Sequence, residues 1–388
     1  GAPFTKLETK TPEGLKLNPL YTQGDSPSDD AAGFPGSAPF TRGNRLLGNA
    51  ESGWEIHQAM SGETIDTLIA GIQGALGRGV KSTWLALNQS RFTKEEWIRL
   101  LDSIPETTDG IGLETGATPL LAAALLSHYE SRKWSGSINA DPIGSLAANG
   151  SLPRSLASAL DEVVCLHRWC QTNQPNLRTV RVSTVAYHEA GANSVQELAI
   201  ALCTGVYYLR ELTQRGVPVD SVIPKMGFQF AIGRNVFMEV AKLRAARLVW
   251  SKVIQACTSE THDGMWIHAV TSPVTLTKRD PWVNMLRTTA ATFAAATGGA
   301  NQITSAPFDQ AIGAPDDFSQ RIASHTQVIL EEESHLGAVI DPAGGSWYIE
   351  SLTTELAQSA WKEFQRLEGA GGITSVLESG TLQNELED

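Results

Sequence analysis

Short apolar or β-branched runs alternate with longer segments of helical apolar spacing through most of this chain. Such alternation is typical of βα units around a parallel sheet. Eight runs of this kind lie at Ser82 to Leu87, Gly110 to Glu114, Gly136 to Ala140, Thr179 to Val185, Ser221 to Met226, Met265 to Val270, Asn301 to Ser305 and Ala338 to Asp341. Eight units predict an α/β fold of the (β/α)8 TIM-barrel type rather than an open doubly wound sheet.

The two ends of the chain depart from the barrel pattern. Residues 1–40 are rich in Pro, Gly, Asp, Ser and Thr without a sustained apolar period, which predicts an extended N-terminal arm. Such an arm either contacts a partner or is a loose terminus. Residues 371–388 are rich in Gly, Ser and acidic residues and resemble the start of a linker. The predicted organisation is therefore an arm over 1–40, a barrel over 41–370 and a linker start over 371–388.

Composition excludes several classes of partner. The net charge of −12 and the lack of a basic stripe argue against nucleic acid or anionic membrane as a ligand. No apolar run approaches the roughly 20 residues of a membrane-spanning helix. The cysteines include no CxxC pair and are not spaced like metal ligands, so we expect no metal site. We expect the protein in a reducing compartment, either a bacterial cytoplasm or an organelle matrix. These cysteines are Cys165, Cys170, Cys203 and Cys257.

Several ordered segments carry a family resemblance. They are Asp280-Pro-Trp-Val-Asn-Met-Leu-Arg287, Gly298-Gly-Ala-Asn-Gln-Ile-Thr-Ser305 and Asp341-Pro-Ala-Gly-Gly-Ser-Trp-Tyr-Ile-Glu350, preceded by Phe34-Pro-Gly-Ser-Ala-Pro-Phe-Thr-Arg-Gly43 and Phe237-Met-Glu-Val-Ala-Lys-Leu-Arg-Ala-Ala-Arg247. With these segments the chain resembles the barrel of the adenosylcobalamin-dependent acyl-CoA mutases, the methylmalonyl-CoA mutase family, up to about residue 370. Ordered agreement of this length is far more specific than one short motif.

A barrel of this kind carries its functional groups at the C-terminal ends of the strands. The substrate-binding candidates there are Asn139, Asp141, His188, Gln229 and His268. A barrel lyase or hydrolase that uses Asp141, His188 and His268 is a third and weaker interpretation, because three scattered polar residues make no motif.

The fourth strand departs from the family at its catalytic histidine. In this region catalytic mutases carry a pattern similar to Gly-Tyr-His-Met-Gln-Glu-Ala-Gly-Ala. The resemblance implies that the His of that pattern hydrogen-bonds the substrate thioester carbonyl. This chain has Thr184-Val-Ala-Tyr-His-Glu-Ala-Gly-Ala192 instead. Without gaps, Ala186 fills the His position, and a methyl group cannot polarise a carbonyl. With a two-residue deletion, His188 takes that place and is the fallback catalytic candidate. We favour the ungapped match, because shifting a packed strand would displace its buried side chains.

Two further positions differ from the catalytic pattern. Asn149 stands where the family has the Arg that binds the substrate carboxylate, and an amide does not replace a bidentate guanidinium. The family also places a Tyr downstream of Arg42-Gly43, but residues 44–52 contain no aromatic side chain. Aromatic residues on the strands, Trp84, Trp266 and Phe228, either pack in the core or fill a barrel that has no channel for coenzyme A.

These losses resemble the small, non-catalytic subunit of heterodimeric methylmalonyl-CoA mutases, so no catalytic residue is assigned. The resemblance implies a homologous catalytic subunit as partner and an acyl-CoA substrate, (R)-methylmalonyl-CoA or succinyl-CoA, in the complex. It also implies adenosylcobalamin in the assembled enzyme but not on this chain alone, because the D-x-H-x-x-G run that supplies the cobalt ligand does not occur in this sequence. The alternative is an active mutase barrel that uses His188, with the cobalamin domain removed or on another chain.

Overall fold

The computed structural model, which describes residues 4–27, 32–87, 92–129 and 131–387, contains a closed barrel of eight parallel strands. In barrel order the strands are β10 (Gln302–Thr304), β3 (Glu55–Met60), β4 (Ser82–Ala86), β5 (Gly110–Gly116), β6 (Gly136–Ala140), β7 (Leu177–Ser183), β8 (Met226–Ile232) and β9 (Ile267–Thr271). Strand β10 closes the barrel because Ile303 pairs with Ile56 on one side and with Ala269 on the other. The predicted fold class is confirmed.

Two of the eight predicted strands are wrong. Residues 221–226 form the end of α8 (Val219–Val222) and the 3-10 turn η3 (Ile223–Lys225), and strand β8 only begins at Met226. Residues 338–341 form turns and bends rather than a strand. The strand that the sequence pattern missed is β3, whose Glu-Ile-His-Gln-Ala-Met run places polar side chains between apolar ones and lacks a β-branched stretch.

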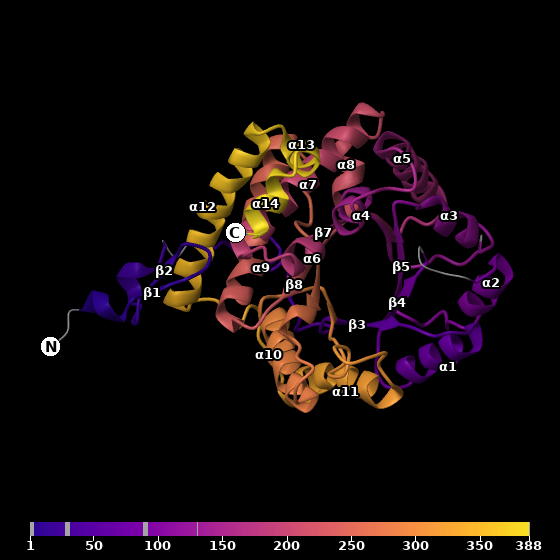
Figure 1. Ribbon diagram of the computed structural model, residues 1–388, viewed down its shortest axis with the longest axis horizontal. Helices are drawn as coiled ribbons and strands as arrows, with labels where there is room; N and C mark the ends of the chain where they lie inside the picture. Colours follow the sequence, from indigo (N-terminus) through magenta and orange to yellow (C-terminus); the bar gives the residue numbers. More distant parts are fainter. Residues whose placement is uncertain (1–3, 28–31, 88–91, 130, 388) are drawn as a thin grey trace.

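A ring of helices surrounds the barrel, as Figure 1 shows from one end of it. Apolar side chains on the outer strand faces, such as Phe228 and Ile303, are buried beneath these helices, and Phe228 packs edge-on against Trp250 at 4.7 Å. The helices are α1 (Ile65–Leu76), α2 (Lys94–Asp102), α3 (Leu120–Leu126), α4 (Pro142–Asn149), α5 (Leu156–Asn173), α6 (Val185–Glu189), α7 (Ser194–Gln214), α9 (Val236–Cys257), α10 (Asn284–Thr297), α11 (Asp317–Val328) and α12 (Trp347–Gly369).

The two ends of the chain lie on the side of α12. The arm contains η1 (Phe4–Leu7), a short hairpin of β1 (Thr9–Lys10) and β2 (Lys16–Leu17), and η2 (Gln23–Asp25), and it extends beyond α12 in Figure 1. Tyr21 contacts Tyr348 of α12, with ring centroids 4.9 Å apart. The segment predicted to begin a linker is instead helical in α13 (Gly372–Glu378) and α14 (Thr381–Glu387), because Ile373, Val376 and Leu382 bury apolar side chains.

No helix in the described ranges is long and apolar enough to cross a membrane.

Candidate functional site

The interior of the barrel is filled by polar and aromatic side chains. Successive side chains of a strand point to opposite faces, so alternate residues of each strand face the axis. Near the middle of the barrel, Arg181 of β7 makes a two-point ion pair with Glu114 of β5, and the indole N–H of Trp84 donates to Glu114 Oε2 at 3.2 Å. The T-shaped ring contacts of His268 with His57 and Trp84, at 5.2 and 5.5 Å, complete this axial layer.

The axial layer lies between two separate cavities. One, of about 560 Å³, is at the N-terminal end of the barrel, and the other, of about 220 Å³, is at the C-terminal mouth; no residue lines both. Along β7 and the turn after it, Arg178 lines the first cavity and Val185 the second, with Arg181 between them. Along β9 and the residue before it, Trp266 lines the first cavity and Val270 the second, with His268 between them. The described part of the barrel therefore has side chains across its axis where a channel would run.

Three of the candidate residues belong to or border this layer. Gln229 Nε2 lies 3.2 Å from His268 Nδ1, and His268 Nε2 lies 2.8 Å from Thr304 Oγ1, so both ring nitrogens of His268 have partners. Burial, with smaller contributions from His57 and Arg181, lowers the pKa of His268 well below its usual value. Asn139 on β6 is buried. A neutral, fully hydrogen-bonded His268 packs the barrel and is not available as an acid.

Asp141 has a structural environment. It is the N-cap of α4, where it accepts a hydrogen bond from the Gly144 backbone at 2.8 Å, and it also accepts from Tyr208 Oη at 2.6 Å and from the Ser183 backbone at 3.0 Å. Burial raises the pKa of Asp141, and Arg181 acts in the opposite direction. Because its carboxylate oxygens already hold three donors, Asp141 positions α4 and strand β7 rather than a substrate.

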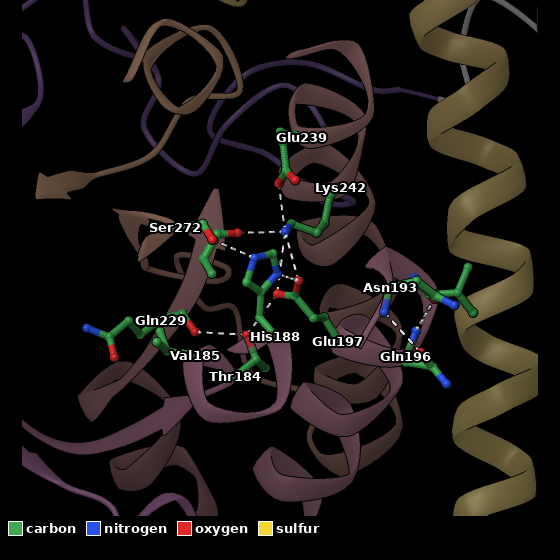
Figure 2. A network of polar contacts seen from close by, with 12 residues as sticks. Thr184, Val185, His188, Asn193, Gln196, Glu197, Gln229, Glu239, Lys242 and Ser272 are labelled. Carbon is green, nitrogen blue, oxygen red and sulfur yellow. Dashed lines mark hydrogen bonds and ion pairs between the residues drawn. The ribbon is translucent and has the colours of Figure 1, made fainter. Parts of the chain in front are cut away.

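His188 lies in a second polar network at the C-terminal mouth, which Figure 2 shows. It belongs to the short helix α6, which follows Thr184 at the end of β7. His188 Nδ1 lies 2.6 Å from Glu197 Oε1 on α7, and His188 Nε2 lies 2.8 Å from Ser272 Oγ after β9. Both ring nitrogens are therefore engaged by protein groups. Neither is left to bond a substrate carbonyl.

The charge that holds this network together comes from α9. Lys242 is fully buried and contacts Glu197 Oε1 at 3.3 Å, Glu239 Oε2 at 2.6 Å and the Ala231 carbonyl at 2.7 Å. Burial opposes the charge of Glu197, but Lys242 and His188 outweigh it and lower the pKa of Glu197. Burial raises the pKa of Glu239 despite the nearby Lys242. A buried cation with two carboxylates and a carbonyl is a stable packing element, whose disruption is costly.

The order Ser272, His188, Glu197 is that of a nucleophile, a base and an orienting carboxylate. A nucleophile must reach its substrate, however, and Ser272 has no exposed surface. Lys242 also donates to both oxygens of the Glu197 carboxylate, which makes Glu197 part of a larger ion cluster. We therefore interpret Ser272, His188 and Glu197 as a buried series of hydrogen bonds that joins α6, α7 and the end of β9, and not as a catalytic triad.

The two positions at which the motif predicts a loss of family side chains lie near the mouth. Ala186 is on α6, and Asn149 is the last residue of α4, which contacts α6. Asn149 is exposed, and its amide donates to the Ser145 carbonyl at 2.9 Å. Within the segment 44–52, by contrast, residues 44–46, 51 and 52 line the cavity at the N-terminal end of the barrel. The predicted loss of the family's Tyr from this segment stays a prediction.

The axial ion pair was missed by sequence reasoning. Arg181 stands between the apolar Val180 and Val182, and Glu114 stands between the apolar Leu113 and the β-branched Thr115. A charged residue between apolar neighbours in a strand signals an inward position in a barrel with a polar interior. The sequence alone would therefore have been enough to predict inward positions for these two residues. Of the strand aromatics, Trp84 and Trp266 contact His268 inside the barrel, whereas Phe228 faces the helices.

Comparison of the sequence with known proteins places this chain in a family. The family model described as "Methylmalonyl-CoA mutase" matches residues 10–91 and 95–388. The chain is 42% identical to the methylmalonyl-CoA mutase small subunit of Streptomyces virginiae, over 97% of the chain and 61% of that protein. It is 35% identical to the small subunit of Propionibacterium freudenreichii subsp. shermanii, over 96% of the chain and 58% of that protein. The Escherichia coli (strain K12) methylmalonyl-CoA mutase is 30% identical, over 98% and 58%. The chain thus spans about three fifths of the length of these relatives.

Proposed function

The chain belongs to the methylmalonyl-CoA mutase family, and we propose that it forms the barrel of a non-catalytic small subunit. In this proposal the chain pairs with a homologous catalytic subunit. That subunit interconverts (R)-methylmalonyl-CoA and succinyl-CoA by adenosylcobalamin-dependent rearrangement. The names of the Streptomyces and Propionibacterium relatives support the small-subunit assignment.

The environment of His188 is the observation that carries the proposal. An active barrel needs a donor for the thioester carbonyl, and His188 is the fallback for that role. Its two ring nitrogens are instead taken by Glu197 and Ser272, at 2.6 and 2.8 Å. The neighbouring Ala186 carries no polar atom. The hydrogen bonds of His188 thus favour the small-subunit proposal over an active barrel.

The axial layer supports the same conclusion. A coenzyme A arm that followed the barrel axis would meet Trp84 and the Glu114–Arg181 ion pair. Displacing that pair would expose or separate two charges whose side chains are 12% exposed, which is energetically costly. A barrel that does not bind the substrate does not need this path open.

The described residues of the mouth do not fit a cobalt-ligating role. The histidines of the mouth and of the axial layer beneath it, His57, His188 and His268, each hydrogen-bond to neighbouring side chains. No group of three or more His, Cys, Asp or Glu side chains able to hold a metal occurs among the described residues. In this proposal adenosylcobalamin belongs to the assembled enzyme and not to this chain alone, as the family resemblance implies.

Co-expression with the homologous catalytic mutase chain of the same source organism tests the proposal. Light scattering after gel filtration should detect a complex with one copy of each chain, and succinyl-CoA formation should appear only when the catalytic chain is present. Recovery of the two chains in separate fractions at micromolar concentration would contradict the pairing. Succinyl-CoA formation by this chain without the catalytic chain would contradict the proposal that this chain is non-catalytic.

A further inference from the structure

The cavity at the C-terminal mouth is a separate compartment above the axial layer. Its volume is about 220 Å³. Apolar side chains supply much of its wall, including Ala59, Trp84, Val185, Val270 and Pro307. A concave, largely apolar compartment with a few polar groups, placed at the strand ends of a TIM barrel, is the usual form of a small-molecule site.

The charge of the cavity wall decides which ligands it can accept. Among the described lining residues there is no Lys or Arg, and Glu189 at the mouth is an acid. His57 also lines the cavity, and burial lowers the pKa of His57 to about 3, so the ring is neutral at physiological pH. An anionic ligand would be desolvated here without a countercharge, which is unfavourable. A carboxylate or phosphate is therefore disfavoured.

Two side-chain amides supply the specific polar contacts. Gln58 on β3 is 7% exposed and donates through Nε2 to Gln320 Oε1 of α11 at 3.0 Å. Gln58 Oε1 is buried and has no hydrogen-bond partner. The Nε2 group of Gln320 donates to no residue in the described ranges, and both glutamines line the cavity. The pair thus holds one unpaired acceptor and one unpaired donor. Gln58 Oε1 is covered in this conformation, so the Gln58 amide must rotate for a ligand in the cavity to reach it.

We propose that this cavity binds a small neutral molecule with an apolar body and a primary carboxamide. The ligand N–H would donate to Gln58 Oε1, and its carbonyl would accept from Gln320 Nε2. A ligand that satisfies this unpaired buried acceptor gains affinity, because the protein alone leaves the acceptor without a hydrogen bond.

Benzamide and benzoate are matched probes, because they share a planar apolar body and differ in charge and in the N–H donor. We expect ligand-observed NMR titration to show saturable benzamide binding that is at least about tenfold tighter than that of benzoate, a difference of ~1.4 kcal/mol. Equal binding of the two probes, or no saturable benzamide binding at millimolar concentration, would overturn the proposal.

Two substitutions locate the binding. Ala59 is exposed and lines the cavity, so A59F should fill the cavity without overpacking the core and should abolish benzamide binding. Gln58→Met keeps the length of the side chain but removes its acceptor, and it should weaken benzamide about fivefold while leaving benzoate unchanged. Thermal melting of both variants checks the fold. Benzamide binding that persists in folded A59F would place the site elsewhere and reject the assignment.

Discussion

Arg181 Nη2 lies 2.7 Å from Glu114 Oε1 inside the barrel, and a second contact joins the same two groups. Each side chain is 12% exposed. The pair joins β5 to β7 across β6, which lies between them. Because the Trp84 indole also donates to Glu114, one carboxylate connects three strands and occupies the axis where a channel would run. The axial layer is therefore part of the stability of this barrel.

Removing one member of the pair should destabilise the barrel strongly. Arg181→Met leaves Glu114 buried without its partner, and we expect a loss of about 3–5 kcal/mol in the free energy of unfolding. The double variant R181M/E114Q should recover a large part of that loss, because the Glu114 charge is no longer buried without a partner. The nearby Asp141 loses Arg181 at 3.9 Å but keeps its other hydrogen-bond donors. Urea unfolding followed by circular dichroism measures both. A loss in R181M below about 1 kcal/mol would show that solvent reaches the pair and screens it.

Acid should destabilise the fold through buried histidines. Burial lowers the pKa of His57 to about 3, whereas an unfolded histidine has a pKa of about 6.5. Between these values the unfolded state binds a proton that the folded state does not, so stability is fully present above pH ~6.5 and falls as the pH drops. His57→Gln should reduce the slope of unfolding free energy against pH, between about pH 4 and 6, by roughly 1.4 kcal/mol per pH unit. An unchanged slope would contradict a neutral, buried His57.

The arm should contribute to association more than to folding. Among its described residues in the range 6–27 only Leu15 is buried, while Leu7 and Leu20 are 64% and 62% exposed. Deleting residues 1–33 should therefore shift the melting temperature little and weaken the complex with the catalytic chain, as measured by calorimetry. The substitution Tyr21→Ala, which removes the contact with Tyr348, is a milder form of the same test. Unchanged affinity in both variants would count against an arm that binds the partner.

The sequence predicted the barrel and offered Trp84 as one of the residues that fill it, but it did not predict the Glu114–Arg181 ion pair. Six strands were located because their β-branched or apolar runs are bounded by turn residues, and β3 was missed because His57, Gln58 and Glu55 interrupt such a run. The His188 contacts could not be predicted, because Glu197 and Ser272 are 9 and 84 residues away and meet His188 only after the barrel closes. The replacement of the family's histidine by Ala186 rests on the motif alone and stays a prediction.

Restoring the missing groups should restore recognition of the acyl part of the substrate. Ala186→His and Asn149→Arg would place a donor and a guanidinium on two helices that contact each other, α6 and α4. Because the axial layer would obstruct a coenzyme A arm, the probe is a methylmalonyl thioester of N-acetylcysteamine. A charged hydrogen bond contributes about 1.5–3 kcal/mol, so the double variant should bind this thioester at least about tenfold more tightly than the unmodified chain.

The control variant for that experiment carries large side chains at the same two positions but lacks the imidazole and the guanidinium. Ala186→Phe combined with Asn149→Gln should bind the thioester no better than the unmodified chain. Equal binding by the restored and control variants would show that Ala186 and Asn149 do not face the same site. The ungapped match of the fourth strand would then be wrong.

Variants of the two chains in the assembled enzyme show which of the two barrels carries out turnover. In the complex with the catalytic chain, His188→Gln should leave kcat and KM for methylmalonyl-CoA unchanged within about twofold, because an amide can still bond Glu197 and Ser272 but cannot act as an imidazole acid. Replacing the catalytic chain's own thioester-binding histidine by alanine should abolish the same activity. A complex in which H188Q lowers kcat a hundredfold or more, at an unchanged melting temperature, would mean that this barrel takes part in the chemistry.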